Sequence, residues 1–138
     1  MMTKTKLKQG DLVEAVITDL SDTGDGVARI DQLVVFVPDT VPGDRAQIRL
    51  VNVKPNYARG KVKELLQSSP DRVRAACIVA DKCGGCQWQH IGYEYQLEAK
   101  RKVVVQALER IGGFIEPQVD PLLTAGTPFS YRNKATYP

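Results

Sequence analysis

The stretch at residues 45–66 reads RAQIRLVNVKPNYARGKVKELL and decides the fold. In residues 45–53 apolar side chains alternate with polar ones, which is the two-residue period of a β-strand with one buried face. Pro55-Asn56 interrupts the pattern as a turn would. Residues 57–66 then continue as a second strand. The stretch therefore predicts two adjacent strands with their polar side chains on an outward surface.

The polar side of these two strands is basic. Asp44 and Glu64 are the acids that stand against its cations, so this part holds a local excess of positive charge that the net charge of +3 conceals. Charged residues at alternate strand positions can also merely face water. As a set, however, they predict a nucleic-acid-binding surface with aromatic side chains for base stacking, and Phe36 is an additional stacking candidate. The predicted binding residues are Arg45, Arg49, Tyr57, Arg59, Lys61 and Lys63.

Three further short strands are predicted upstream, at Leu12–Leu20, Val27–Ile30 and Leu33–Val37. Small and glycine residues at 21–26 supply one connection, and Asp31-Gln32 supplies a two-residue hairpin link. No helix in this half is long enough to cover an open sheet. Five short strands without such cover predict a sheet closed on itself as a small oligonucleotide-binding (OB)-like barrel.

A polar linker with a proline, residues 67–71, predicts a domain boundary. We assign residues 1–67 to the barrel and residues 68–138 to a second part. Within the second part, residues 92–111 predict one amphipathic helix, because apolar residues recur at three- and four-residue intervals until a Gly-Gly pair.

The tail closes with residues 131–137, which look like the opening of a strand that has no partner in this chain. The predicted fold class is therefore mainly β, then α+β: a barrel, a cysteine-rich loop, one helix and the start of a further β domain. We expect the chain to be the N-terminal fragment of a longer protein.

Every cysteine and the only histidine lie between Cys77 and His90. Three thiols spaced C-x5-C-x2-C indicate metal ligands, because soft thiolates select iron-sulfur clusters or zinc. A four-iron cluster would need a fourth ligand from elsewhere. Zinc would instead be held in a Cys3His site. A metal-free core of small thiols explains the clustering less well. The candidate metal ligands are Cys77, Cys83 and Cys86, with His90 added in the zinc alternative.

Composition bounds the cellular context. The chain is 43% hydrophobic and 25% charged, and no apolar run approaches the length of a membrane span. The basic N-terminus lacks the apolar segment of a secretory signal. An odd, clustered set of thiols points to metal chemistry in a reducing compartment. We expect a cytoplasmic monomer without a membrane partner.

Taken in order, these features resemble the N-terminal part of bacterial RNA uracil-5-methyltransferases that act on ribosomal or transfer RNA. The barrel is similar to a TRAM domain in the turn patterns at residues 24–28 and 36–44. The sequence CGGCQWQH at residues 83–90 resembles the iron-sulfur signature of that family and is the most specific match. The segment YRNKA at residues 131–135 completes the order. The resemblance covers the chain from about Gly10 to Pro138.

The resemblance implies a [4Fe-4S] cluster held by Cys77, Cys83 and Cys86, with the fourth cysteine beyond residue 138, and it favours iron-sulfur over zinc. It also implies an RNA partner, with 23S ribosomal RNA preferred over transfer RNA. The family methylates a flipped-out uracil with S-adenosylmethionine, after a cysteine has added to the ring.

No catalytic residue is assigned. The 138 residues contain no G-x-G-x-x-G turn for that cofactor and no fourth cysteine for a nucleophile. We therefore expect S-adenosylmethionine to be bound only by the full-length parent. The alternative is a non-enzymatic nucleic-acid-binding module with a structural zinc site.

Overall fold

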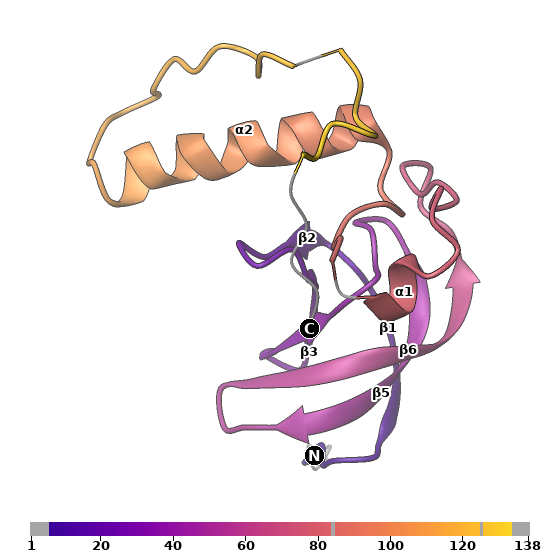
Figure 1. The fold of residues 1–138 in the computed structure, drawn as a ribbon. Helices are drawn as coiled ribbons and strands as arrows, with labels where there is room; N and C mark the ends of the chain where they lie inside the picture. Colours follow the sequence, from indigo (N-terminus) through magenta and orange to yellow (C-terminus); the bar gives the residue numbers. More distant parts are fainter. Residues whose placement is uncertain (1–5, 84, 125, 134–138) are drawn as a thin grey trace. The chain divides into compact units, whose positions relative to one another are not determined.

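The computed structural model describes residues 6–83, 85–124 and 126–133. The chain divides into two compact units, Met1–Gly92 and Tyr93–Pro138. The first unit holds a β-sheet and the cysteine-rich segment, and the second holds one long helix and an extended tail (Figure 1).

The first unit is built on a six-stranded sheet with the strand order β1-β5-β6-β4-β3-β2. Neighbouring strands are antiparallel, except for the parallel pair of β4 and β6. The strands are β1 (Leu12–Val16), β2 (Asp19–Leu20), β3 (Gly26–Ile30), β4 (Leu33–Val37), β5 (Arg45–Val53) and β6 (Tyr57–Gln67).

The first predicted strand is divided, so that the sheet has six strands where the sequence predicted five. The break falls at Ile17 and Thr18, where the chain changes partners. The Ile17 amide donates to the Asp44 carbonyl at 2.8 Å, and the Thr18 amide donates to the Val27 carbonyl at 2.9 Å. β1 and β2, which occupy the two ends of the strand order, are therefore consecutive in the chain. The other four strands confirm the predicted positions within one residue at each end.

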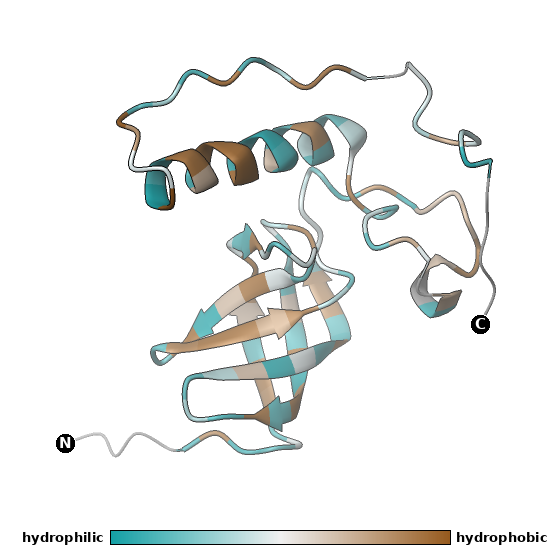
Figure 2. Cartoon of the chain, turned by 60° about the vertical axis from the view of Figure 1, so that its left-hand side comes forward, coloured by the Kyte–Doolittle hydropathy of each residue, from teal (hydrophilic) through white to brown (hydrophobic). Residues whose placement is uncertain are grey.

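Alternation along the strands builds the core. Ala46, Ile48 and Leu50 of β5 are fully buried, while the residues between them face outward or are half-buried. Figure 2 shows the corresponding alternation of hydrophobic and hydrophilic positions along the strands. Each buried valine, leucine or isoleucine side chain contributes about 1.5–3 kcal/mol relative to an exposed one. The core consists of Ile17, Ala28, Val35, Val37, Ala46, Ile48, Leu50 and Ala58.

One tight turn and one close packing contact constrain β3. Asp31 and Gln32 both have positive φ, 48° and 71°, and join β3 to β4 as the predicted two-residue hairpin link. Gly26, at the start of β3, packs against Thr40. A Cβ atom on Gly26 would lie 1.8 Å from the Thr40 hydroxyl oxygen, so this position accepts only glycine without rearrangement.

The second unit contains α2 (Tyr93–Arg110), which confirms the predicted helix within one residue at each end. No residue of α2 is buried. Inside this unit the Arg101 Nε donates to the Val119 carbonyl at 2.8 Å, which fixes the tail to the helix. In the part of the chain that is described, no helix has the length and hydropathy needed to cross a membrane.

The predicted last strand and the predicted domain boundary both follow β6 in the chain. Residues 131–133 are not in a strand, and the rest of the predicted strand, residues 134–137, lies outside the described residues. The boundary predicted between residues 67 and 68 falls inside the first compact unit, because the segment that follows it is hydrogen-bonded to the sheet. As a division between domains that boundary stays a prediction. The one-turn helix α1 (Ala80–Cys83) was not predicted.

Gly26→Ala should lower the free energy of unfolding of the first unit by about 3 kcal/mol, because the added methyl group cannot fit beside Thr40. Urea unfolding followed by the fluorescence of Trp88, the single tryptophan, measures this change. Combining Gly26→Ala with Thr40→Ala removes the obstructing hydroxyl and should recover part of the loss. A Gly26→Ala variant as stable as the parent chain would contradict the packing described.

Candidate functional site

The outward surface of β5 and β6 carries all six predicted binding residues. We call this surface the basic face. Its members are exposed, and the register places Arg49 directly opposite Lys61. Like charges that face each other across a strand pair destabilise a sheet. A bound polyanion would remove that cost. The basic face is Arg45, Arg49, Tyr57, Arg59, Lys61 and Lys63.

The cations of the basic face differ in their partners. Arg45 forms an ion pair with Glu14, and Arg59 lies 3.6 Å from an Asp25 carboxylate oxygen. Arg49, Lys61 and Lys63 have no acidic partner within the residues that the structure describes. These three cations of the basic face are therefore available to an incoming anion.

An aromatic pair lies beside Arg59 on the basic face. The rings of Phe36 and Tyr57 meet edge to face, with centroids 6.1 Å apart and an interplanar angle of 66°. The Arg59 guanidinium lies 6.0 Å from the centroid of the Phe36 ring. The pairing of β4 with β6 creates this group, because it puts Phe36 opposite Arg59. Tyr57 is exposed and Phe36 is half-buried. An exposed aromatic ring beside cations is the combination that binds unpaired bases and their phosphates.

The segment of residues 69–92, which bears the cysteines, is held to the sheet by the Asp44 carboxylate. Asp44 is fully buried and accepts hydrogen bonds from the amides of Val41 at 2.8 Å and Ser69 at 2.7 Å. It also forms an ion pair with Arg72 at 2.5 Å. Burial by itself raises the pKa of Asp44, but the hydrogen bonds from Arg72, Ser69 and Val41 outweigh it and hold this pKa below 3.8.

Two further contacts attach the same segment. The Trp88 indole N–H donates to the Gly24 carbonyl at 2.9 Å, and the His90 Nε2 lies 3.1 Å from the Thr40 carbonyl oxygen. Because a carbonyl oxygen only accepts, Nε2 carries the proton. Burial lowers the pKa of His90, which favours the neutral ring.

Sequence reasoning missed the roles of Asp44, Arg72 and Trp88. An ion pair between residues 28 positions apart leaves no periodic signal. Trp88 offered a signal, since it is the only tryptophan and lies inside the cysteine motif. His90, by contrast, is hydrogen-bonded, as lone histidines commonly are.

The three cysteine side chains are exposed and form no disulfide. Cys83 ends α1, and the Cys77 amide donates to the Gln89 side-chain oxygen at 3.1 Å, which joins the two ends of the loop at residues 77–89. Within residues 6–83, 85–124 and 126–133, no three side chains of His, Cys, Asp or Glu lie close enough to hold a metal ion. The donor set still fits a thiolate-bound metal in its chemistry, because three unpaired thiols are available within ten positions.

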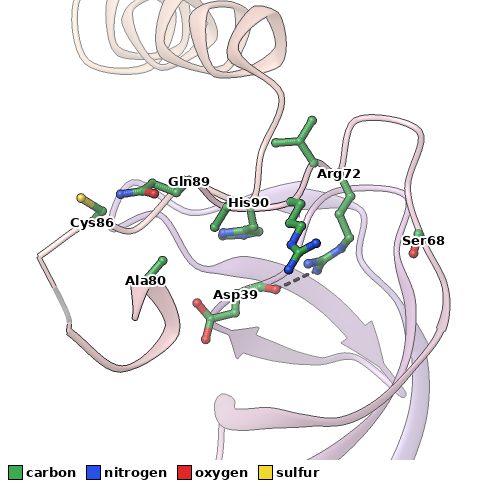
Figure 3. A pocket seen from close by; sticks show the side chains of 10 residues that line it. Asp39, Ser68, Arg72, Ala80, Cys86, Gln89 and His90 are labelled. Atoms are coloured by element: carbon green, nitrogen blue, oxygen red, sulfur yellow. Dashed lines mark hydrogen bonds between the residues drawn. The ribbon is translucent and has the colours of Figure 1, made fainter. Parts of the chain in front are cut away.

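A cavity of about 470 Å³ lies between the sheet and the cysteine-bearing segment, entirely within the first unit. Figure 3 shows Gln89 and His90 on one side of it and Asp39 and Ala80 on the other. Arg72 donates to the Asp39 carbonyl at 2.8 Å, which closes one wall. The other lining residues are Ser68, Val73, Arg74, Ala75 and Cys86.

The comparisons with known proteins give a domain match for the sheet and relatives for nearly the whole chain. Residues 6–63 match the family model of the TRAM domain. The chain is 66% identical to an uncharacterized RNA methyltransferase of Nostoc sp., over 99% of this chain and 30% of that protein. It is 43% identical to an uncharacterized RNA methyltransferase of Halalkalibacterium halodurans, over 96% of this chain and 29% of that protein. The chain thus spans less than a third of the length of these relatives.

Among solved structures, the chain is similar to the tRNA (uracil-54, C5)-methyltransferase of Pyrococcus abyssi, determined in complex with S-adenosyl-L-homocysteine. The two are 34% identical with a TM-score of 0.48, over 70% of this chain and 21% of that chain.

Asp44→Asn should lower the free energy of unfolding by about 3 kcal/mol, because it leaves the Arg72 charge without its buried partner. Urea unfolding followed by Trp88 fluorescence measures the loss. Glu14→Gln is the matched control: it breaks an ion pair whose side chains are about half exposed and should cost less than about 1 kcal/mol. Equal effects of the two variants would show that Asp44 does not hold the segment.

The stability of the first unit should fall in acid. Since the pKa of Asp44 is depressed in the folded state, its contribution is fully present above the unfolded value of 3.8 and is lost as pH falls through the lower folded value. Urea midpoints measured between pH 7 and pH 2 should therefore fall more steeply in the parent chain than in Asp44→Asn. Parallel curves would argue against a depressed pKa at Asp44.

Proposed function

We propose that this chain, which carries a TRAM domain, is the RNA-binding and [4Fe-4S]-binding part of an S-adenosylmethionine-dependent RNA (uracil-C5)-methyltransferase that acts on 23S ribosomal RNA. The observation that carries the proposal is the basic face, because all six of its residues lie within the TRAM match at residues 6–63. The similarity to proteins named RNA methyltransferases supports the enzyme class.

RNA binding would use charge and stacking together. Arg49, Lys61 and Lys63 would contact phosphates, while Tyr57 would stack on an unpaired base. The proposal treats the sheet as a closed OB-like barrel. The hydrogen bonds at Ile17 and Thr18 support closure, since they join one continuous segment to Asp44, the residue before β5, and to Val27 of β3.

The cluster would be held by Cys77, Cys83 and Cys86, and a fourth ligand would come from outside this set. Exposed, unpaired thiols on one short segment support this role. The bound cluster would cross-link the three cysteines and so hold the loop in one conformation. We therefore assign the cluster a structural role. The contacts of Trp88 and His90 would then hold that loop against the sheet.

Methyl transfer would be carried out by residues outside this chain. Uracil as the target, S-adenosylmethionine as the donor and 23S ribosomal RNA as the substrate rest on the match of residues 83–90 to the family signature. The chain would supply substrate binding to that reaction in the cytoplasm, as part of a monomer.

Lys61→Gln with Lys63→Gln should weaken binding of single-stranded RNA and flatten its salt dependence. Two lost phosphate contacts should reduce the slope of log K against log salt by about 1.4. Fluorescence anisotropy with a labelled 12-nucleotide RNA at several salt concentrations measures both. Lys102→Gln with Arg110→Gln removes the same charge from α2 and is the control. Unchanged affinity and slope in the Lys61 and Lys63 variant would eliminate the basic face as the RNA contact.

Anaerobic purification of the full-length protein should yield iron and acid-labile sulfide in a ratio near one, with a broad absorption in the visible range. Cys86→Ser should lose most of the iron, while Ser68→Cys, which keeps all three native thiols, should retain it. Metal analysis and absorption spectra give the answer. A colourless protein with stoichiometric zinc would instead establish the Cys3His alternative.

A further inference from the structure

We infer that the cavity between the sheet and the cysteine-bearing segment receives one unpaired base of the bound RNA. The inference rests on the proposed RNA binding and adds a second site to it. RNA is recognised mainly through single-stranded bases that leave the stack and enter protein pockets. The cavity has the size, the charge and the free polar groups that such a base needs.

The charge of the cavity favours a neutral guest over a phosphate. Arg72 is neutralised by its ion pair with the buried Asp44. Among the remaining lining residues, Asp39 carries a negative charge and Arg74 a positive one, so the lining has no excess of cations. A nucleobase is neutral, whereas a phosphate would meet the unpaired Asp39 carboxylate on one wall.

The polar groups of the lining can bond the edge of a base. In the described part of the chain the Asp39 carboxylate accepts no hydrogen bond, and the Gln89 amide nitrogen donates none. A carboxylate on one side and an amide donor on the other can bond two different edges of one base, the first through an N–H group and the second through an oxygen or ring nitrogen. Gln89 is fixed for this task, because its oxygen already accepts from the Cys77 amide at 3.1 Å. Figure 3 shows Asp39 and Gln89 on opposite sides of the hollow.

The remaining wall can hold the faces of the ring. Val73, Ala75 and Ala80 contribute apolar surface to the lining. A volume of about 470 Å³ lies in the range of small-ligand sites. Several lining residues, among them Ser68 and Arg74, are exposed, so the cavity opens to solvent and a base could enter while attached to its strand.

The position of the cavity along the chain connects it to the basic face. Tyr57, Arg59, Lys61 and Lys63 follow one another on the exposed side of β6, and β6 ends at Gln67. The next residue, Ser68, lines the cavity. An RNA strand whose phosphates follow the cations of β6 is therefore led to the cavity opening.

The test uses the full-length protein and 12-nucleotide single-stranded RNAs in which 2-aminopurine replaces one base at successive positions. Binding should raise 2-aminopurine fluorescence at one position, because the base leaves the stack when it enters the cavity. Asp39→Asn should weaken binding about fivefold, since a charged acceptor for the base edge is lost. Its salt slope should stay unchanged, because no phosphate contact is removed.

The sign of the Asp39→Asn effect is the decisive readout. If Asp39 only repelled phosphate, its neutralisation would tighten binding. The substitution should not disturb the backbone, because Asp39 has a φ of 62°, a conformation that asparagine also adopts. Ala75→Trp fills the cavity and should abolish the fluorescence rise. Ala107→Trp on α2 is its matched control and should leave the rise intact.

Two outcomes separate this inference from the proposed function. Equal or tighter binding by Asp39→Asn, or a fluorescence rise that survives Ala75→Trp, would overturn the cavity as a base site. RNA binding that still depends on Lys61 and Lys63 would then leave the proposed function standing. Absence of RNA binding by the parent protein would overturn both.

Discussion

The buried Asp44 carboxylate is the interaction on which the arrangement of the first unit depends. A carboxylate with no exposed surface is stable only when its charge and lone pairs are matched, and the guanidinium of Arg72 with the amides of Val41 and Ser69 provides that match. Two of these donors belong to the segment that follows β6. These contacts attach the cysteine-bearing segment to the sheet, and Arg72, which makes one of them, lines the cavity.

A second consequence concerns the connection between β2 and β3. Its Gly24 carbonyl accepts from the Trp88 indole, and its Asp25 carboxylate lies 3.6 Å from Arg59 on the basic face. Gly24 has a φ of 93°, and a Cβ atom there would lie 2.9 Å from the indole nitrogen. One short turn thus contacts both the cysteine-bearing segment, through Trp88, and the basic face, through Arg59. These two contacts connect the proposed cluster site to the proposed RNA-binding surface.

The sequence predicted the sheet well because strand alternation and turn residues act locally. The bounds of β4 and β5 and the Asp31-Gln32 link follow from such patterns. The division of the first strand at Ile17 was not predictable, since it depends on distant partners, Asp44 and Val27. The ion pair of Asp44 with Arg72 and the cavity were not predictable either, because both depend on residues that are distant in the sequence. The basic residues could be identified as a set, but Arg45 and Arg59 were not distinguishable from the free cations until Glu14 and Asp25 were seen beside them.

The central claim is that the first unit binds single-stranded RNA along β6 and at the adjoining cavity. Photocrosslinking tests it most directly, with 4-thiouridine placed throughout a single-stranded RNA and the crosslinked peptides of the full-length protein identified by mass spectrometry. The account predicts crosslinks to peptides that contain Phe36, Tyr57 and residues 68–75. Crosslinks confined to α2 and the residues after it, with none in the first unit, would contradict the account.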